Sequence, residues 1–477
     1  MIFEIIGERA GGETKNFLYD NELNIISADG VPFEYPVIPE ITSPISLPFD
    51  KDHPLHKSRD VVHLKIQMGL SCNYSCDYCS QKFVERPPET TKADIDQFMT
   101  SLDVLTFHES IGLKIEFWGG EPFVYWKTMK PLAEALMARF SGWTQKPVLS
   151  VITNGSILTD EMIDWLMQHN FIVSISHDGP GQSVRGPDPF DDPEQKERLL
   201  GFYRMMTRLG KGFSFNAMLN SKNKSRQAIK DWFVELTGDP NVPLGEGGIV
   251  DAYDDDGIGS SLNSLEEHFE FRRQSFSEIL AANGEIGFRG TIQKLDDFTN
   301  SVLSHQHSKY LGQKCGMDSE HTLAVDLRGN VLTCQNVSAA ETSKNDEPHL
   351  GGNLSDFAAV KLTSSTHWSN RDECAGCPVL HLCKGACMFL DKKFWKVSCA
   401  NSYSDNIALF ALSFQKITGF IPTLIQHPDL PPERKDVFGT FLKHIESPRA
   451  KLSQIKVVNQ LAGKIDDVEV YAQARQS

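Results

Sequence analysis

The chain has 477 residues and a formal net charge of −16, from 47 Lys plus Arg against 63 Asp plus Glu. Its 40% hydrophobic and 23% charged residues exclude a collagenous or wholly disordered chain and, at this length, predict two or three domains. The acidic balance argues against nucleic acid or an anionic membrane as a partner, and the lack of a long apolar run or a signal peptide predicts a cytoplasmic protein.

The first sixty residues, rich in proline, predict an N-terminal extension over residues 1–60. Within it, Ile2–Ile6 and Phe17–Ile26 flank a turn at Gly11–Gly12, which predicts a β-hairpin. Such a hairpin would either add a strand to a bound substrate or lie as a strap over the rest of the protein.

Between residues 61 and 262, short β-rich runs alternate with longer amphipathic runs, which predicts parallel strands joined by helices. The predicted strands are Val61–Met68, Leu113–Trp118, Val148–Thr153, Phe171–Ser176, Phe213–Leu219 and Gly247–Ala252. The predicted helices between them are Lys92–Thr106, Met129–Phe140, Asp160–His169, Gln195–Leu209 and Ser225–Leu236. Six units are too few for a closed eight-stranded barrel, so we expect an α/β fold with an open, partial (β/α)6 TIM-like barrel and functional loops at the carboxyl ends of its strands.

The loop after the first predicted strand contains three cysteines in the run Cys72-Asn-Tyr-Ser-Cys76-Asp-Tyr-Cys79. Three thiolates at this spacing can hold three corners of an iron–sulfur cubane, which leaves its fourth iron open. Zinc is the alternative reading. Structural zinc sites need four ligands, however, and no further Cys or His lies nearby in the sequence.

Cys-x3-Cys-x2-Cys with an aromatic residue, Tyr78, before the third cysteine resembles the signature of the radical S-adenosylmethionine (SAM) superfamily, whose fold is a partial (β/α)6 barrel. The resemblance implies that Cys72, Cys76 and Cys79 hold a [4Fe–4S] cluster whose open iron is chelated by SAM. An electron from a donor such as flavodoxin or ferredoxin then cleaves SAM, and the resulting 5′-deoxyadenosyl radical abstracts a hydrogen atom from the substrate.

Three further motifs follow the next three predicted strands in order. Gly119-Gly120-Glu121-Pro122 comes after the second strand, where glycines let backbone approach a ligand and Glu121 can bind an ammonium group. By resemblance, this motif binds the amino group of SAM. Asn154 and Ser176 follow the third and fourth strands, and the resemblance places them near the carboxylate and ribose of SAM, although such residues also cap turns. Tyr78 is expected in the same cofactor site.

A helical linker is predicted over residues 263–310, with a helix at Ser264–Leu280 and a polar connection after it. The region 311–405 holds seven of the ten cysteines and many turn residues, which is typical of a small domain organised around metal. A helix at Asn406–Lys416 and a polar tail are expected in residues 406–477.

The seven later cysteines exceed one tetrahedral site, and a zinc ribbon needs two Cys-x2-Cys pairs where only one is present. Their pattern resembles the SPASM domain, a small α+β module that carries auxiliary [4Fe–4S] clusters in radical enzymes that modify peptides and proteins. The resemblance implies an inner cluster held by Cys315, Cys334 and Cys387. It implies an outer cluster held by Cys374, Cys377, Cys383 and Cys399, so that the protein would carry three [4Fe–4S] clusters. The fourth ligand of the inner cluster would be His321, water or a substrate atom.

The resemblance favours a maturase that modifies a ribosomally synthesised peptide, commonly by forming an intramolecular crosslink. Its partners would be the precursor peptide or protein and, because the N-terminal extension is short for a leader-binding domain, a separate leader-binding protein. In the sulfatase-maturing branch a carboxylate directly after the second SPASM cysteine is the general base. Gln335 stands there and cannot take a proton, which disfavours that activity unless Asp318 or Asp326 substitutes.

Several alternatives stay open at this point. A dehydrogenase of a protein side chain or of a small molecule would use the same clusters, and a zinc-stabilised binding module is the alternative outside enzymes. The acidic loop Asp251–Asp256 would either contact a basic peptide or lie in solvent. Arg185 and Arg204 are candidates to meet the cofactor or a substrate carboxylate.

Overall fold

The computed structural model describes residues 1–40, 45–245, 247–282, 286–342, 347–363, 366–390 and 392–441. Five parallel strands form the barrel: β6 (His63–Gln67), β7 (Lys114–Trp118), β8 (Val148–Thr153), β9 (Ile172–Ser176) and β10 (Phe213–Asn216). Their apolar side chains, such as Leu64, Ile66 and Phe117, are fully buried, as expected of strands covered on both faces. Five of the six predicted barrel strands are therefore confirmed.

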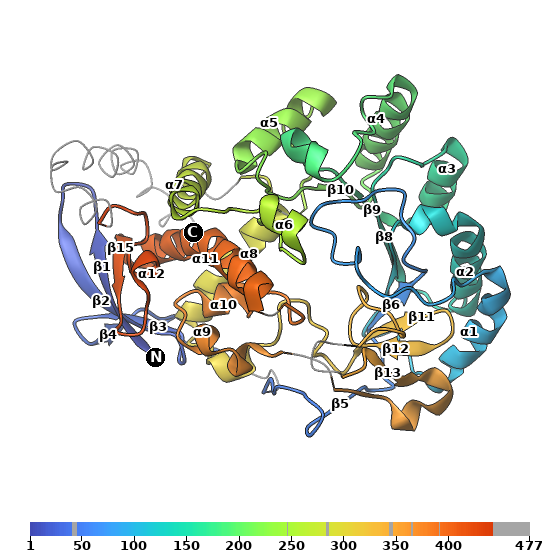
Figure 1. The fold of residues 1–477 in the computed structure, drawn as a ribbon, viewed down its shortest axis with the longest axis horizontal. Helices are drawn as coiled ribbons and strands as arrows, with labels where there is room; N and C mark the ends of the chain where they lie inside the picture. Colours follow the sequence, from blue (N-terminus) through green and yellow to red (C-terminus); the bar gives the residue numbers. More distant parts are fainter. Residues whose placement is uncertain are drawn as a thin grey trace.

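Helices on the outer side of the sheet follow the predicted barrel strands in turn (Figure 1). They are α1 (Ile95–Ser101), α2 (Trp126–Arg139), α3 (Asp160–Gln168), α4 (Pro193–Arg208) and α5 (Arg226–Thr237). Polar side chains begin most of them: Thr159, Asp192 and Ser225 each accept a backbone hydrogen bond at the first turn of α3, α4 and α5. All five predicted helices are confirmed, to within a few residues at their ends.

The sixth predicted strand, Gly247–Ala252, is wrong as a continuous element. One isolated parallel bridge forms in this segment, between Leu219 and Ile249, and a second, between Phe215 and Leu244, lies before it. Glycines at 245, 247 and 248 supply no side chains to pack against a neighbouring strand, and such residues weaken a strand interior. The barrel is thus open beyond β10.

The cysteine-rich region extends the barrel sheet instead of forming a separate one. The strand β11 (Thr322–Asp326) pairs in parallel with β6, and β12 (Asn330–Leu332) and β13 (Leu350–Asn353) follow it in antiparallel order. The complete sheet has eight strands in the order β10-β9-β8-β7-β6-β11-β12-β13. This pairing brings the segments with Cys315 and Cys334 beside the first barrel strand, whose following loop contains Cys72.

The N-terminal hairpin is confirmed as β1 (Ile2–Glu8) and β2 (Thr14–Asp20). It belongs to a five-stranded sheet of order β15-β1-β2-β3-β4, with β3 (Ile25–Ala28), β4 (Val31–Pro32) and β15 (Ile421–Gln426). Because β15 and β3 occupy its two edges, the hairpin has no edge left for a substrate strand. The interpretation as a strap is the one that fits.

Between this sheet and the barrel lies a group of helices (Figure 1). The predicted linker helix is α7 (Leu265–Ala281), but α8 (Arg289–Leu303) occupies the segment expected to be a polar connection, and α11 (Lys392–Thr418) begins well before Asn406. Leu295, Phe298 and Val302 form the buried face of α8. The remaining short elements are β5 (Leu55–His56), β14 (Lys361–Leu362), α6 (Asp255–Gly259), α9 (Asp372–Ala375), α10 (Leu380–Cys383) and α12 (Pro432–Lys435). None of the helices in the described residues could cross a bilayer.

Candidate active site

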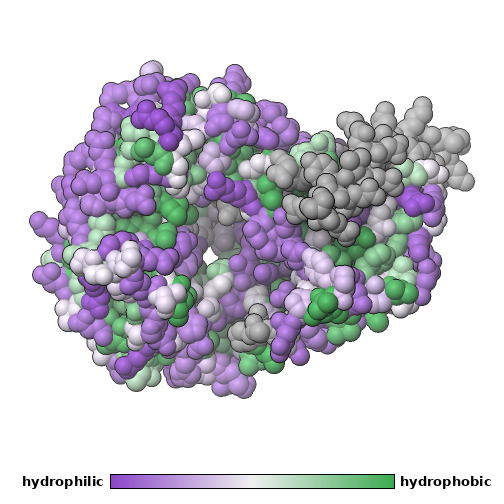
Figure 2. Space-filling view, turned by 180° about the vertical axis from the view of Figure 1, so that it is seen from behind, coloured by the Kyte–Doolittle hydropathy of each residue, from purple (hydrophilic) through white to green (hydrophobic). Residues whose placement is uncertain are grey.

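The loops at the carboxyl ends of β6 to β9 surround a cavity of about 490 Å³. Its lining contains every residue predicted for the first cluster and its cofactor: Cys72, Cys76, Cys79, Tyr78, Gly119, Gly120, Glu121, Asn154 and Ser176. Figure 2 shows that the molecule is hollowed at the centre of one face, with mostly hydrophilic residues around the hollow. The fold therefore gathers four motifs that lie up to about a hundred residues apart in the sequence.

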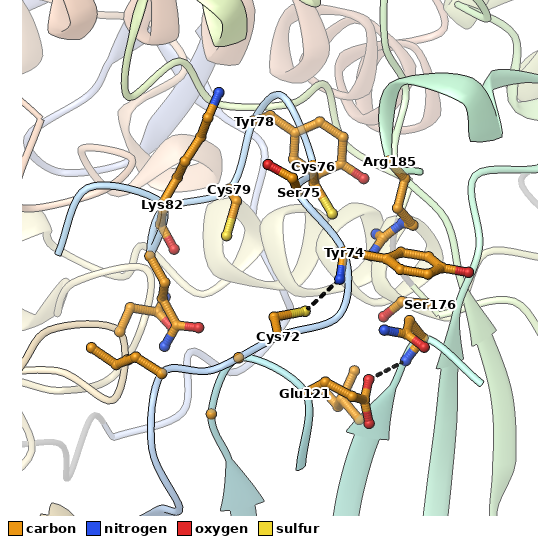
Figure 3. Close-up of a pocket in the computed structure, with 18 of the residues that line it drawn as sticks. Cys72, Tyr74, Ser75, Cys76, Tyr78, Cys79, Lys82, Glu121, Ser176 and Arg185 are labelled. Atoms are coloured by element: carbon orange, nitrogen blue, oxygen red, sulfur yellow. Dashed lines mark hydrogen bonds between the residues drawn. The ribbon is translucent and has the colours of Figure 1, made fainter. Parts of the chain in front are cut away.

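The thiols of Cys72, Cys76 and Cys79 point into the same space (Figure 3). Cys72 Sγ accepts a hydrogen bond from the backbone N–H of Tyr74 at 3.3 Å. Burial raises the pKa of the Cys76 thiol to about 12, and the negative charges of Cys79 and Cys72 act in the same direction, whereas Arg185 opposes the rise. Three thiols packed in this way ionise together only when a cation compensates them, which is the donor set of a metal centre.

The Gly119-Gly120 turn lies directly against the cysteine loop. Gly120 N–H donates to the carbonyl of Gly69 at 3.1 Å and Glu121 N–H donates to that of Ser71 at 3.0 Å. A Cβ atom on Gly119 would lie 2.6 Å from the Gly69 carbonyl oxygen, and one on Gly120 would lie 2.4 Å from that of Ser71. Glycine is required at both positions because the obstructing atoms are backbone.

Glu121 is buried at the floor of the cavity and held by three hydrogen bonds. Oε1 accepts from Phe123 N–H at 3.1 Å and Thr153 Oγ1 at 2.7 Å, and Oε2 accepts from Asn154 N–H at 2.7 Å. Burial raises the pKa of Glu121, while these hydrogen bonds act in the opposite direction. A carboxylate has about four lone-pair sites, so this arrangement fixes the group and leaves acceptor capacity for an ammonium group.

Asn154 connects the third barrel loop to the cysteine loop. Its Nδ2 donates to Asn73 Oδ1 at 2.9 Å, and its Oδ1 accepts from both the N–H and the hydroxyl of Ser156. Ser176 ends β9 on the wall of the same cavity. Both residues lie where the sequence motifs predicted, and Asn154 also has the turn-forming role that was its alternative.

A buried hydrogen-bond network around Asp178 connects to the cysteine loop through Tyr78. Asp178 Oδ2 accepts from the Tyr78 hydroxyl at 2.6 Å, and Oδ1 accepts from Met218 N–H at 3.0 Å and from the Arg185 guanidinium at 3.3 Å. Arg185 lines the cavity, as expected. Arg204 does not, because it lies on the exposed side of α4 and pairs with Glu197 at 3.6 Å, so that candidate was wrong.

We expect the substitution Asp178→Asn to destabilise the protein strongly. Asparagine leaves the Arg185 charge without its buried partner, and breaking such a pair costs about 3 kcal/mol of unfolding free energy. Thermal unfolding of the loaded protein measures the effect. The matched change Asp160→Asn removes an exposed carboxylate that pairs with Arg198, which keeps Glu194 as a partner, and should shift the melting temperature little. Equal shifts for both variants would contradict a supporting role for Asp178.

The electrostatic interactions of the later cysteines link Cys334 with Cys315 and Cys387, and they link Cys374 with Cys377, Cys383 and Cys399. Burial raises the pKa of Cys334 to about 12, with added repulsion from Cys315 and Cys387. Burial likewise raises the pKa of Cys377 to about 12, with added repulsion from Cys399 and Cys383. Cys374 also repels the charges of Cys383, Cys377 and Cys399. Cys315 is exposed, whereas the other six cysteines are buried or half-buried, where thiolates need a compensating cation.

Two cations beside these groups had no signal in the sequence. Arg434 of α12 donates through Nη2 to Cys399 Sγ at 3.0 Å and lies 3.9 Å from Cys377 Sγ. Lys65 of β6 is buried and its charge acts on both Cys315 and Cys334. Such cations stabilise thiolates. The sequence could not reveal them because each comes from an element distant from its cysteines.

His321 has protein partners on both ring nitrogens. Nδ1 lies 2.7 Å from the carbonyl oxygen of Asp60, and Nε2 lies 3.6 Å from the Glu320 carboxylate. In the described residues no three His, Cys, Asp or Glu side chains lie close enough to hold a single metal ion. Cubane ligands are spaced more widely because each thiolate binds a different iron, so this finding does not argue against clusters.

The carboxylates suggested as substitutes for Gln335 lie outside the cavity. Asp318 accepts a hydrogen bond from Gln313 N–H at 2.8 Å, and Asp326 accepts from Arg328 N–H at 2.9 Å. Neither lines the cavity, whereas Asp251 does. Asp251 is the residue that the sequence reasoning missed here, because it was read only as part of an acidic loop.

That acidic loop is mostly paired with lysines. Lys82 contacts Asp254 at 3.3 Å and Asp256 at 2.6 Å, and Lys393 contacts Asp255 at 2.6 Å. Asp254 also caps the first turn of α6. The loop is therefore not a free acidic surface for a basic peptide, and Asp251 is its one carboxylate on the cavity wall.

Residues 66–205 match the model of the Radical SAM superfamily. The chain contains a radical SAM domain and is an enzyme that uses SAM and [4Fe–4S] clusters. It is similar to the radical SAM cyclopropyl synthase TigE of Paramaledivibacter caminithermalis, at 22% identity over 72% of this chain and 71% of TigE. It is also similar to the cysteine-type anaerobic sulfatase-maturating enzyme of Clostridium perfringens, at 22% identity over 66% of this chain and 85% of the relative.

Among solved structures, the chain resembles native anSMEcpe with bound AdoMet and Cp18Cys peptide. The TM-score is 0.53 and the identity 18%, over 75% of this chain and 98% of the other. This likeness confirms the predicted fold class, a partial TIM-like barrel followed by a SPASM-type domain.

Proposed function

We propose that the protein is a maturase that modifies a ribosomally synthesised peptide by radical hydrogen abstraction, forming an intramolecular crosslink. The observation that carries this proposal is the cavity, which extends from Cys72, Cys76 and Cys79 to Tyr253 and Asn336. The last two residues also line a second cavity beside Cys334 and Cys387. The two cavities are therefore neighbours with a shared wall, one beside the first cysteine group and the other beside the inner auxiliary group.

In this proposal Cys72, Cys76 and Cys79 hold the [4Fe–4S] cluster that, with SAM bound, supplies the 5′-deoxyadenosyl radical. Glu121 binds the amino group of SAM through its remaining acceptor capacity, and the Gly119-Gly120 backbone lets it approach. Asn154 and Ser176 contact the carboxylate and ribose. The barrel walls position the substrate beside the radical and shield the reaction from bulk solvent.

In this proposal the seven later cysteines are the ligands of the two auxiliary clusters. Cys315, Cys334 and Cys387 hold the inner cluster, and its fourth position takes water or a substrate atom, because Nδ1 of His321 lies in a hydrogen bond with the Asp60 carbonyl and its Nε2 lies beside the Glu320 carboxylate. Cys374, Cys377, Cys383 and Cys399 hold the outer cluster, next to Arg434. A flavodoxin or ferredoxin supplies electrons, and a separate protein binds the leader of the precursor.

Dehydrogenation of a protein side chain is the second candidate function. It is favoured by the similarity to sulfatase-maturating enzymes, which spans most of their length. Gln335 in place of a carboxylate argues against the same arrangement of the general base. Asp251 is the carboxylate on the cavity wall that is positioned for that role in this chain.

Mass spectrometry of candidate precursor peptides, co-expressed with the enzyme, tests the proposal. We expect a loss of two hydrogens, with fragmentation blocked between two residues that a new bond connects. The same loss confined to one residue would identify the dehydrogenase instead. Turnover of a small alcohol or sugar, without binding or change of any peptide, would overturn the proposal.

A further inference from the structure

A second cavity of about 490 Å³ lies beside the inner cysteine group. Cys334 and Cys387 form part of its wall, and it shares Ser80, Tyr253 and Asn336 with the first cavity. A substrate that places one residue near Cys72, Cys76 and Cys79 can therefore extend into this second space. Apart from Cys334 and Cys387, the residues that line the second cavity hold neither cluster in this proposal, so they are candidates to contact the substrate.

The lining of the second cavity combines carboxylates with aromatic rings. Its acidic side chains are Asp50, Asp52, Glu341 and Glu347, and its aromatic residues include Tyr253, Phe83, Phe389 and Phe394. Lys51 is the basic side chain of the described lining, and it contacts Asp52 at 2.6 Å. The lining therefore has an excess of negative charge next to apolar surface.

Glu341 has an unused acceptor in this cavity. Its Oε2 is buried and has no hydrogen-bond partner among the described residues. The backbone of Glu341 is fixed on both sides, because its N–H donates to Ser338 and its carbonyl accepts from His349 N–H at 3.1 Å. Leaving a buried acceptor unpaired costs free energy, and a bound donor would recover it.

Among the described residues, the titratable groups near Glu341 do not compensate its charge. Burial and the charge of Glu85 raise the pKa of Glu341 to about 6, so the carboxylate is destabilised while the cavity holds no cation. Burial lowers the pKa of His349 to about 4, and that ring is therefore neutral at physiological pH. A cation entering the cavity would meet an uncompensated carboxylate.

We propose that the second cavity binds a basic side chain, Lys or Arg, of the substrate peptide, with Glu341 accepting its hydrogen bonds. Long basic side chains fit this lining because their apolar stems pack on aromatic rings while the charged end reaches a carboxylate. The inference rests on the proposed function and adds the substrate class: a peptide with a basic residue near the modified position.

Fluorescence anisotropy of the anaerobic holoenzyme with SAM tests the inference. The probes are two fluorescein-labelled peptides, Gly-Gly-Lys-Gly-Gly and the same peptide with norleucine in place of lysine. We expect the lysine peptide to bind at least about tenfold more tightly to the wild type, because a hydrogen bond to a charged group is worth that factor or more. Glu341→Gln should abolish the preference.

Glu4→Gln removes one negative charge from β1, which does not line the cavity, and should leave the preference intact. Equal binding of the two peptides to the wild type, or a preference that survives Glu341→Gln, would overturn the inference. Failure of the proposed function has a different signature, since neither peptide would then bind. Iron content of each variant verifies that the compared proteins are equally loaded.

Discussion

Replacing Cys76 with alanine should abolish reductive cleavage of SAM. Two remaining thiolates, Cys72 and Cys79, cannot hold a cubane that has a single open iron, and without that iron SAM has no site at which to accept an electron. Chromatography of 5′-deoxyadenosine formed under dithionite measures the loss. We expect the rate to fall to that of the reaction without enzyme.

Iron analysis of the same variant supplies the control. The auxiliary groups, Cys315 to Cys399, do not use Cys76, so about eight of twelve irons should remain. This result would show that the rest of the protein is folded and loaded. Persistent cleavage by a variant that has lost four irons would contradict the assignment of the first cluster.

Gly120→Ala should lower the rate of SAM cleavage about a hundredfold, without altering any cluster ligand. The new Cβ would lie 2.4 Å from the Ser71 carbonyl oxygen and 2.7 Å from that of Leu70, which are backbone atoms of the cysteine loop. Either that loop or the Glu121 turn must then move by about 1 Å, and a displacement of this size costs about two orders of magnitude in rate. The rate of 5′-deoxyadenosine formation checks the expectation.

Gly201→Ala is the matched control for this substitution. Gly201 lies in α4, and a Cβ there would meet no atom within 4 Å. We expect normal SAM cleavage and a gain of about 1 kcal/mol in unfolding free energy, because alanine is the better helix former. If Gly120→Ala cleaved SAM at the wild-type rate, close contact between the two loops would not be needed for the cofactor site.

Local patterns predicted the barrel because each unit buries one continuous apolar stripe. The apolar residues of strand β7 and helix α3, for example, follow the spacing typical of a buried strand and of an amphipathic helix. Thr159 also caps the first turn of α3. Gly247–Ala252 had the same apolar character, but its glycines and the neighbouring turn reduced it to a single bridge. A pattern of hydrophobicity could not reveal that difference.

Elements that depend on distant partners could not be predicted. The long helix α11 is buried on most sides by α7, α8 and β15, so its sequence shows little contrast between faces. The pairing of β11 with β6 joins residues more than two hundred positions apart. Local propensity contains no information about such contacts.

The residues of the candidate site likewise fall into those that the sequence revealed and those that it did not. Motifs with fixed spacing, such as Cys72 to Cys79 and Gly119 to Glu121, were visible in the sequence and line the cavity. Asp178, Asp251, Glu341 and Arg434 were missed or read differently because their environment is made by other segments. For Glu341 the informative observation is a buried oxygen without a partner, which exists only in the folded protein.

Electron paramagnetic resonance of the reconstituted, reduced protein, combined with iron and sulfide analysis, tests the central assignment most directly. We predict about twelve irons with matching sulfide per chain and a cluster signal that changes when SAM is added, because SAM binds an open iron. Two or three zinc ions per chain, or a cubane signal that SAM leaves unchanged, would contradict the account.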